Sequence, residues 1–170
     1  MNMWTEDLVL PEKLHEERLQ KEPASYTAWI LGKSGKTQEK KRKAVIICPG
    51  GGYEHLSPRE GEPIAMKYLA MGYHVFVLHY SLAPERFPTA LRELALLTAR
   101  IREHADEWLI DPEGIIVSGF SAGGHLALSL GVHWDKEWLY RPLGLTPEQI
   151  RPDGLILCYP VVTAGEGCHR

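Results

Sequence analysis

Five short apolar segments recur along the chain and predict the strands of a sheet. Four of them, residues 44–48, 75–78, 115–117 and 154–159, are continuous apolar runs. Such runs are typical of strands whose two faces are both covered. The fifth, residues 24–31, alternates small or polar side chains with bulky ones and predicts an outer strand.

Segments with helical spacing lie between these strands. Pro63 can begin a helix that Gly72 ends. A longer helix is indicated by mostly apolar positions at spacings of three and four: Leu91, Leu94, Thr98, Ile101, Ala105 and Trp108. Residues 111–114, Asp-Pro-Glu-Gly, predict a turn into the next strand. This alternation from residue 44 onward predicts an α/β fold, a mostly parallel sheet with helices on both faces.

One domain over residues 24–170 accounts for this alternation. Residues 1–23 are charged and weakly patterned, which predicts an N-terminal arm that is frayed or holds a short amphipathic helix with Leu14 and Leu19. Residues 132–152 form an excursion with tryptophan and proline before the last strand. The sequence contains no internal repeat and no low-complexity segment that would divide the chain further.

The composition is that of one soluble globular domain. The chain has 170 residues, of which 44% are hydrophobic and 24% charged, and a net charge of −3. That charge gives no general attraction to nucleic acid or anionic membranes, and no apolar run approaches the roughly 20 residues of a membrane span. The acidic start lacks the layout of a signal peptide. We therefore expect a cytoplasmic protein without nucleic-acid or membrane partners.

The cysteines and the glycine-lysine segments do not indicate a metal or a nucleotide. Cys48, Cys158 and Cys168 lack the paired spacing of metal ligands, and reduced thiols are the simplest interpretation. A phosphate loop ending at residues 35–37 needs a glycine where Ile30 stands. The basic run at residues 40–43 has no interleaved aromatic residues and is typical of a solvated hairpin rim. We expect no metal and no cofactor.

The pentapeptide Gly-Phe-Ser-Ala-Gly at residues 119–123 carries the main candidate chemistry. It follows a β-branched run and precedes an Ala/Leu-rich segment, so it fits G-x-S-x-G at a strand-to-helix turn. Such a turn exposes the hydroxyl of Ser121 at a helix N-terminus, where negative charge is favoured. Gly119 and Gly123 would be required because their neighbours crowd together. The alternative is that Ser121 only caps the helix.

A second glycine segment follows the apolar run at residues 44–48. Pro49 leads into three successive glycines and then Tyr53. Glycines directly after a buried strand let the backbone approach another group closely and present its amides. A flexible turn is the alternative.

Three blocks, residues 48–53, 80–88 and 119–127, together resemble the α/β-hydrolase family in its acetyl-esterase and xylan-associated esterase branch. The resemblance covers the chain from about residue 24. It departs at Pro49, where this branch usually has a histidine. A dinucleotide-binding domain is disfavoured, because residues 119–124 lack the required glycine spacing.

The resemblance implies serine-dependent hydrolysis of small acetyl-type esters, with acetylated carbohydrates as candidate substrates. Ser121 would be acylated, and the oxyanion would be held by the amide of Ala122 and that of Gly51 or Gly52. Tyr53 and His55 would line the substrate pocket or serve only in packing. The implied partner is a small-molecule ester.

The order of catalytic residues departs from the family. In this fold an acid and then a histidine follow the serine, each after a later strand. The histidines after Ser121 are His125, His133 and His169, and none fits: His125 lies on the same helix and resembles a position that buttresses the glycine loop. The resemblance thus implies the front part of a hydrolase, C-terminally incomplete and weakly active or inactive alone.

Two expectations follow from this incomplete pattern. The alternative function is a catalytically silent fragment that acts at most as an interaction module. The apolar run at residues 154–159 would also become an exposed sheet edge, which favours self-association.

Overall fold

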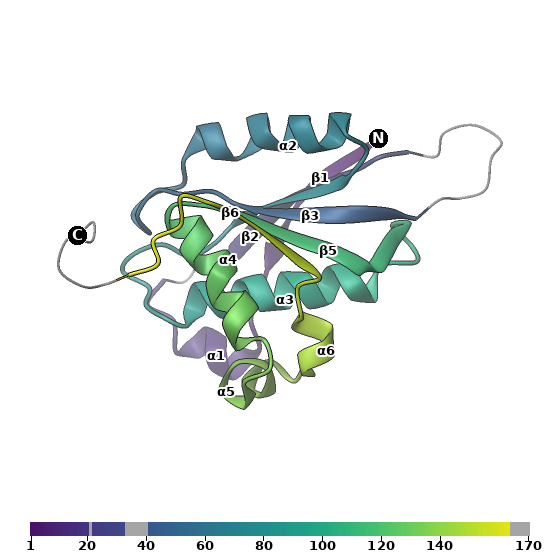
Figure 1. The fold of residues 1–170 in the computed structure, drawn as a ribbon. Helices are drawn as coiled ribbons and strands as arrows, with labels where there is room; N and C mark the ends of the chain where they lie inside the picture. Colours follow the sequence, from purple (N-terminus) through teal and green to yellow (C-terminus); the bar gives the residue numbers. More distant parts are fainter. Residues whose placement is uncertain (21, 33–40, 164–170) are drawn as a thin grey trace.

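A mixed sheet with helices on both faces forms the molecule (Figure 1). The structure is a computed structural model, and it describes residues 1–20, 22–32 and 41–163. In these residues the sheet has six strands in the order β1-β2-β4-β3-β5-β6. The strands are β1 (Asn2–Leu8), β2 (Ala24–Ile30), β3 (Arg42–Cys48), β4 (His74–His79), β5 (Ile110–Phe120) and β6 (Gly154–Cys158). Strands β4, β3, β5 and β6 run parallel, and β1 and β2 are antiparallel to their neighbours.

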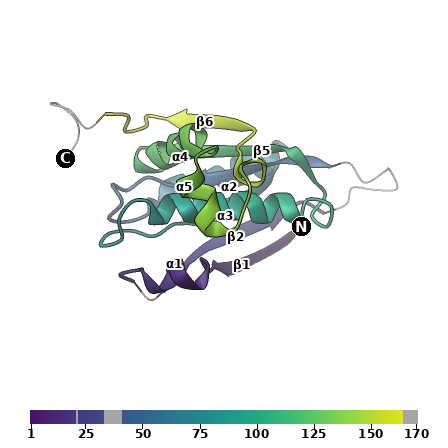
Figure 2. The same ribbon diagram turned by 90° about the horizontal axis from the view of Figure 1, so that it is seen from below.

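The helices divide between the two faces, as Figures 1 and 2 show. Helix α2 (Glu62–Ala70) covers one face, and α3 (Thr89–Glu103) and α4 (Ala122–His133) cover the other. The shorter elements are α1 (Glu12–Glu16), η1 (Pro58–Glu60), α5 (Glu137–Tyr140), η2 (Arg141–Leu143) and α6 (Pro147–Ile150). None of the described helices has both the length and the apolar character needed to cross a bilayer. The predicted α/β architecture is confirmed.

Strand β3 shows why the predicted strands are continuously apolar. Its residues 44–48 are fully buried. Because side chains alternate along a strand, Ala44, Ile46 and Cys48 pack into the core beneath α3 and α4. Val45 and Ile47 pack into the second core beneath α2. Both faces of the strand therefore need apolar side chains.

The N-terminal segment differs from the expectation. Residues 2–8, expected as a frayed arm or part of a helix, form β1, which pairs along its whole length with β2. The pairing crosses the boundary expected at residue 23, so this strand and the predicted domain share one sheet. The expected short helix is α1, which buries Leu14 but leaves Leu19, beyond its end, 64% exposed.

Two further boundaries were wrong. Helix α3 ends at Glu103, before Ala105 and Trp108, although both side chains still reach the core. Residues 111–114 lie inside β5, not ahead of it: Arg42 pairs with Ile110 and Ala44 with Ile115, so they form a bulge. Pro112 has no amide hydrogen for the ladder, which explains the interruption.

Strand β6 forms one edge of the described sheet, with Leu155 and Ile156 each 37% exposed. The segment at residues 33–40, Cys168 and His169 lie outside the described residues.

Candidate active site

Ser121 lies on the sharp turn between β5 and α4. Its backbone has φ 51° and ψ −115°, outside the conformations that most side chains adopt. Such strain in a residue other than glycine is typical of functional sites. The Ser121 side chain makes no capping hydrogen bond to α4, so the structure does not support the simple helix-cap interpretation. The predicted strand–turn–helix context is confirmed.

The two glycines of the pentapeptide are steric requirements. A Cβ atom on Gly119 would overlap the carbonyl group of Gly123. A Cβ atom on Gly123 would overlap the carbonyl oxygen of Cys48, at the end of β3. The turn is therefore packed backbone against backbone, and both positions exclude any side chain.

The glycine loop after β3 runs directly against this turn. A Cβ atom on Gly50 would lie 2.8 Å from the carbonyl oxygen of Phe120 and 3.1 Å from the Cβ of Ser121. Gly51 and Gly52 have φ angles of 131° and 66°. Within the described part of the chain, the amides of Gly51, Gly52 and Ala122 donate no hydrogen bond. These are the donors that an oxyanion would need.

Glu60 holds the glycine loop in place. One carboxylate oxygen accepts the amide of Gly50 at 2.8 Å, and the other accepts the hydroxyl of Tyr159 at 2.8 Å. That bond to a carboxylate raises the pKa of Tyr159. Pro49, where the resembled branch has histidine, accepts the Tyr80 hydroxyl through its carbonyl oxygen at 2.5 Å. Sequence reasoning missed Glu60, because nothing marks an acid in a three-residue 3₁₀ turn as a partner of this loop.

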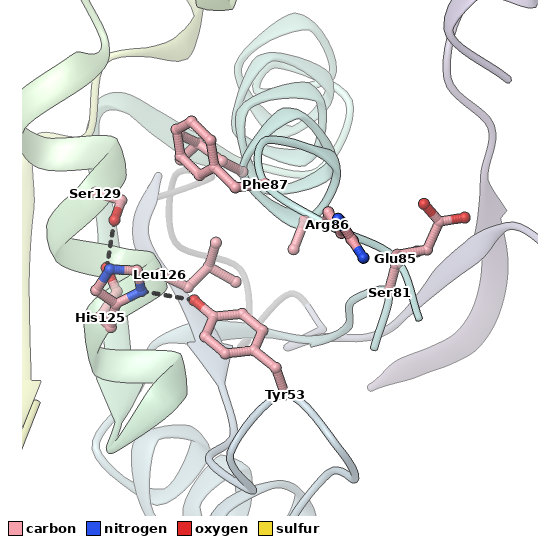
Figure 3. A pocket seen from close by; sticks show the side chains of 10 residues that line it. Tyr53, Ser81, Glu85, Arg86, Phe87, His125, Leu126 and Ser129 are labelled. Atoms are coloured by element: carbon pink, nitrogen blue, oxygen red, sulfur yellow. Dashed lines mark hydrogen bonds between the residues drawn. The ribbon is translucent and has the colours of Figure 1, made fainter. Parts of the chain in front are cut away.

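A pocket of about 180 Å³ lies beside α4 (Figure 3). Its walls include Tyr53, Phe87, His125 and Leu126. The hydroxyl of Tyr53 and Nδ1 of His125 are 2.8 Å apart. Burial raises the pKa of Tyr53 and lowers the pKa of His125, so both groups are neutral near pH 7. His55, predicted with Tyr53 as a substrate-binding residue, is exposed and does not line this pocket.

Neither of the described histidines that follow Ser121 in the sequence is placed to activate it. His125 uses Nδ1 for Tyr53 and bonds to no carboxylate among the described side chains. His133 lies twelve residues along α4, which at about 1.5 Å per residue places it about 18 Å away. His169 lies outside the described residues. The described residues after Ser121 therefore do not supply the histidine base that the family pattern places there.

Residues 81–88, between β4 and α3, form another wall of the pocket and rest on a buried carboxylate. Ser81 donates its amide at 2.8 Å and its hydroxyl at 2.5 Å to Glu93, which is fully buried on α3. Burial raises the pKa of Glu93 from 4.5 to about 7, although the hydrogen bonds from Ser81 and the charge of Arg18 oppose the rise.

This shift predicts a pH dependence of folding stability. Because the folded state holds the Glu93 proton more tightly than the unfolded chain, its contribution is full below about pH 4.5 and is lost as the pH rises to about 7. The Glu93→Gln variant should lose that slope, worth about 3 kcal/mol at most. Urea unfolding between pH 5 and 8 measures it. Glu103→Gln, an exposed glutamate on the same helix, should retain the wild-type slope; equal slopes for wild type and Glu93→Gln would contradict the prediction.

Comparisons with known proteins identify relatives of the chain. The family model described as BD-FAE matches residues 33–149. Endo-1,4-beta-xylanase B of Butyrivibrio fibrisolvens is 35% identical over 133 residues, which are 76% of this chain and 21% of the relative. Acetylxylan esterase of Xylanibacter ruminicola is 30% identical over 125 residues, 73% of this chain and 24% of the relative.

Solved structures with the α/β-hydrolase fold superimpose on the chain. The acetyl ester-xyloside bifunctional hydrolase of Caldicellulosiruptor lactoaceticus has a TM-score of 0.79 at 29% identity, covering 98% of this chain and 60% of its own. The carboxylesterase Cest-2923 of Lactobacillus plantarum has a TM-score of 0.78 at 32% identity, covering 95% and 57%. The chain thus spans about a quarter or less of these curated relatives and about 60% of these solved chains.

Proposed function

The chain belongs to the BD-FAE family of α/β hydrolases, and on that premise we propose that it carries the nucleophile and the oxyanion-binding loop of a serine esterase. The observation that carries the proposal is the strained backbone of Ser121, with the glycine loop after β3 packed against it at Gly50. A turn of this kind exposes a serine hydroxyl at the first turn of a helix, where unpaired amides favour negative charge.

The proposed reaction is acyl transfer to water. The Ser121 oxygen attacks the carbonyl carbon of the ester, and its proton passes to a base. The resulting oxyanion accepts hydrogen bonds from the amide of Ala122 and from that of Gly51 or Gly52. Collapse expels the alcohol, which takes the proton from the base, and leaves an acyl group on Ser121. Water then attacks this ester by the same route and releases the acid.

The proposed reaction also needs a base and an acid that orients it, and we assign both to residues outside those that the structure describes. A serine hydroxyl is a weak nucleophile without such a base. The two described histidines after Ser121 do not supply one: His125 is bonded to Tyr53, and His133 is about a dozen residues along the helix from Ser121.

Small acetyl-type esters are the proposed substrates, and acetylated carbohydrates are the candidate class. The names of two relatives, an acetylxylan esterase and an acetyl ester-xyloside hydrolase, support this class. The pocket beside Tyr53 has room for a small acyl or alcohol group. His55 is exposed and lies outside the pocket lining, so its predicted contact with substrate remains a proposal without support from this pocket. We also propose a cytoplasmic location, supported by the free thiols of Cys48 and Cys158.

A second candidate function is a catalytically silent interaction module. Two observations favour it: neither described histidine after Ser121 serves it, and β6 leaves Leu155 and Ile156 partly exposed at an edge of the described sheet. An apolar edge of this kind offers its unpaired backbone groups to another strand, including one from a second copy.

One comparison separates the two functions. The purified 170-residue chain should hydrolyse p-nitrophenyl acetate no faster than about 10³–10⁴ times the rate in water. That is the residual rate enhancement of hydrolases from which triad members have been removed. It should also elute as oligomers. Joining the chain to the part of the L. plantarum carboxylesterase that it does not match, hereafter the fusion, should give a monodisperse protein. The kcat/KM of the fusion should exceed that of the 170-residue chain by at least about 10²-fold. This is a small part of the roughly 10⁶-fold loss in kcat that removal of a triad residue causes.

A monodisperse 170-residue chain with enzyme-like kcat/KM would contradict this expectation and direct attention to His125 as the base. A soluble, folded fusion with no turnover would favour the silent module.

A further inference from the structure

Arg18, just after α1, reaches into the domain and ends beneath the pocket wall. Its side chain is only 2% exposed. Nη2 donates to the hydroxyl of Ser81 and to the carbonyl oxygen of Glu22, both at 2.8 Å. Nε lies 3.5 Å from Glu85, and Nη2 lies 3.8 Å from Glu93. One guanidinium therefore links the N-terminal segment to both ends of the segment 81–85 and to α3.

A neighbouring residue adds two contacts to the same segment. The backbone amide of Gln20 donates to Glu85 at 2.7 Å, and its side-chain amide donates to the carbonyl oxygen of Ala83 at 3.3 Å. Arg18 and Gln20 thus contact Ser81, Ala83 and Glu85. These three are every second residue of the loop that forms part of the pocket wall.

The charges explain why this contact should fix the loop. The side chains of Glu85 and Glu93 are 4% and 0% exposed, and Arg18 is the cation paired with both among the described side chains. Buried carboxylates need a partner, and breaking a buried pair by removing one member is strongly destabilising. The Arg18 guanidinium donates hydrogen bonds to Ser81 and to the backbone of Glu22, and it lies within ion-pair distance of both acids. The loop is therefore held where Arg18 places it.

The same loop shapes the pocket beside α4, which begins directly after the candidate nucleophile. Ser81, Glu85, Arg86 and Phe87 line it opposite His125 (Figure 3). Phe87 is 66% exposed, and its ring centroid lies 5.6 Å from that of Trp138 on α5, so its position depends on the loop backbone and on this aromatic contact. We propose that Arg18 is a positioning residue: it holds residues 81–87 as the pocket wall and thereby sets which esters fit beside His125. The selection of esters rests on the proposed function, whereas the holding of the loop does not.

Hydrogen exchange of the 170-residue chain tests the holding of the loop. Arg18→Gln alone would leave two buried acids unpaired, so the informative variant is Arg18→Gln with Glu93→Gln, compared with Glu93→Gln alone; in it only Glu85, which still accepts the amide of Gln20, loses its cation. In the double variant the amides of residues 81–88 should exchange at least about tenfold faster than in Glu93→Gln, with those of α4 unchanged. Arg18→Lys should restore part of the protection. Arg102→Gln breaks the Arg102–Asp153 ion pair, which is away from the loop, and should leave residues 81–88 protected.

Kinetics of the fusion test the selection of esters. The ratio of kcat/KM for p-nitrophenyl butyrate to that for the acetate should change at least about threefold in the double variant, mainly through KM, and stay near wild type in Arg102→Gln. Equal loop exchange in the double variant and in Glu93→Gln would overturn the inference, whether or not the fusion hydrolyses esters. Faster loop exchange with an unchanged butyrate-to-acetate ratio would overturn the role in substrate selection. A wild-type fusion without turnover would count against the proposed function and leave the exchange result to decide the holding of the loop.

Discussion

Replacing Ser121 by alanine in the fusion should abolish turnover of p-nitrophenyl acetate, with a loss of about 10⁶-fold in kcat, as removal of a triad serine does in other hydrolases. The reason is chemical: without the hydroxyl no acyl-enzyme forms, and the amides around the turn can only stabilise attack by water. The fold should persist, because the Ser121 side chain makes no capping bond to α4.

Labelling with a fluorophosphonate probe gives an independent measurement. The fusion should be labelled once, at Ser121, and Ser121→Ala should remove the label. Ser118→Ala is the matched control, since Ser118 lies three residues earlier, on β5, but is fully buried, with its hydroxyl 3.3 Å from that of Tyr68. A label that survives in Ser121→Ala would contradict the assignment of the nucleophile.

The second large effect is expected at Gly51. Its φ of 131° is unfavourable for any residue with a side chain, and a Cβ atom would overlap the backbone carbonyl of His55. Gly51→Ala should therefore displace the loop and remove an oxyanion donor, which costs about 10²–10³ in kcat. Steady-state kinetics of the folded fusion measure the loss.

Gly52→Ala is the matched control in the same loop. Gly52 also has a positive φ, 66°, but a Cβ atom there meets nothing within 4 Å. The substitution should cost about 1–2 kcal/mol of stability through backbone strain and reduce kcat less than tenfold. The sequence predicts similar losses at both positions, and the structure separates them. Equal kcat losses in the two variants, or none in Gly51→Ala, would show that loop geometry does not govern oxyanion binding.

The sequence predicted the turn at Ser121 and the glycine loop because both depend on local backbone sterics. Gly119 and Gly123 must be glycine because backbone atoms lie too close for a side chain. This requirement is visible within a motif of five consecutive residues. The catalytic role of Ser121 and the donor roles of Gly51, Gly52 and Ala122 remain predictions. Tyr53 does line a pocket, whereas His55 does not.

The features that the sequence missed depend on distant partners. The sequence of β1 mixes charged and apolar residues without the alternation typical of a strand. It forms a strand because its backbone pairs with that of β2 along its whole length. Glu60 meets Tyr159, and Arg18 meets Ser81, across the fold. Glutamate and arginine are usually exposed, so a single sequence does not mark which of them will be buried.

The backbone crowding at the turn has a consequence for comparing homologues. Gly119 and Gly123 exclude side chains because they touch carbonyl groups of α4 and β3, and that requirement is independent of any reaction. A homologue that had lost catalysis would still need both glycines in order to fold. Conservation of the two glycines among homologues would therefore reflect the fold, and under the proposed function residue 121 is the position of the motif whose identity the reaction itself requires.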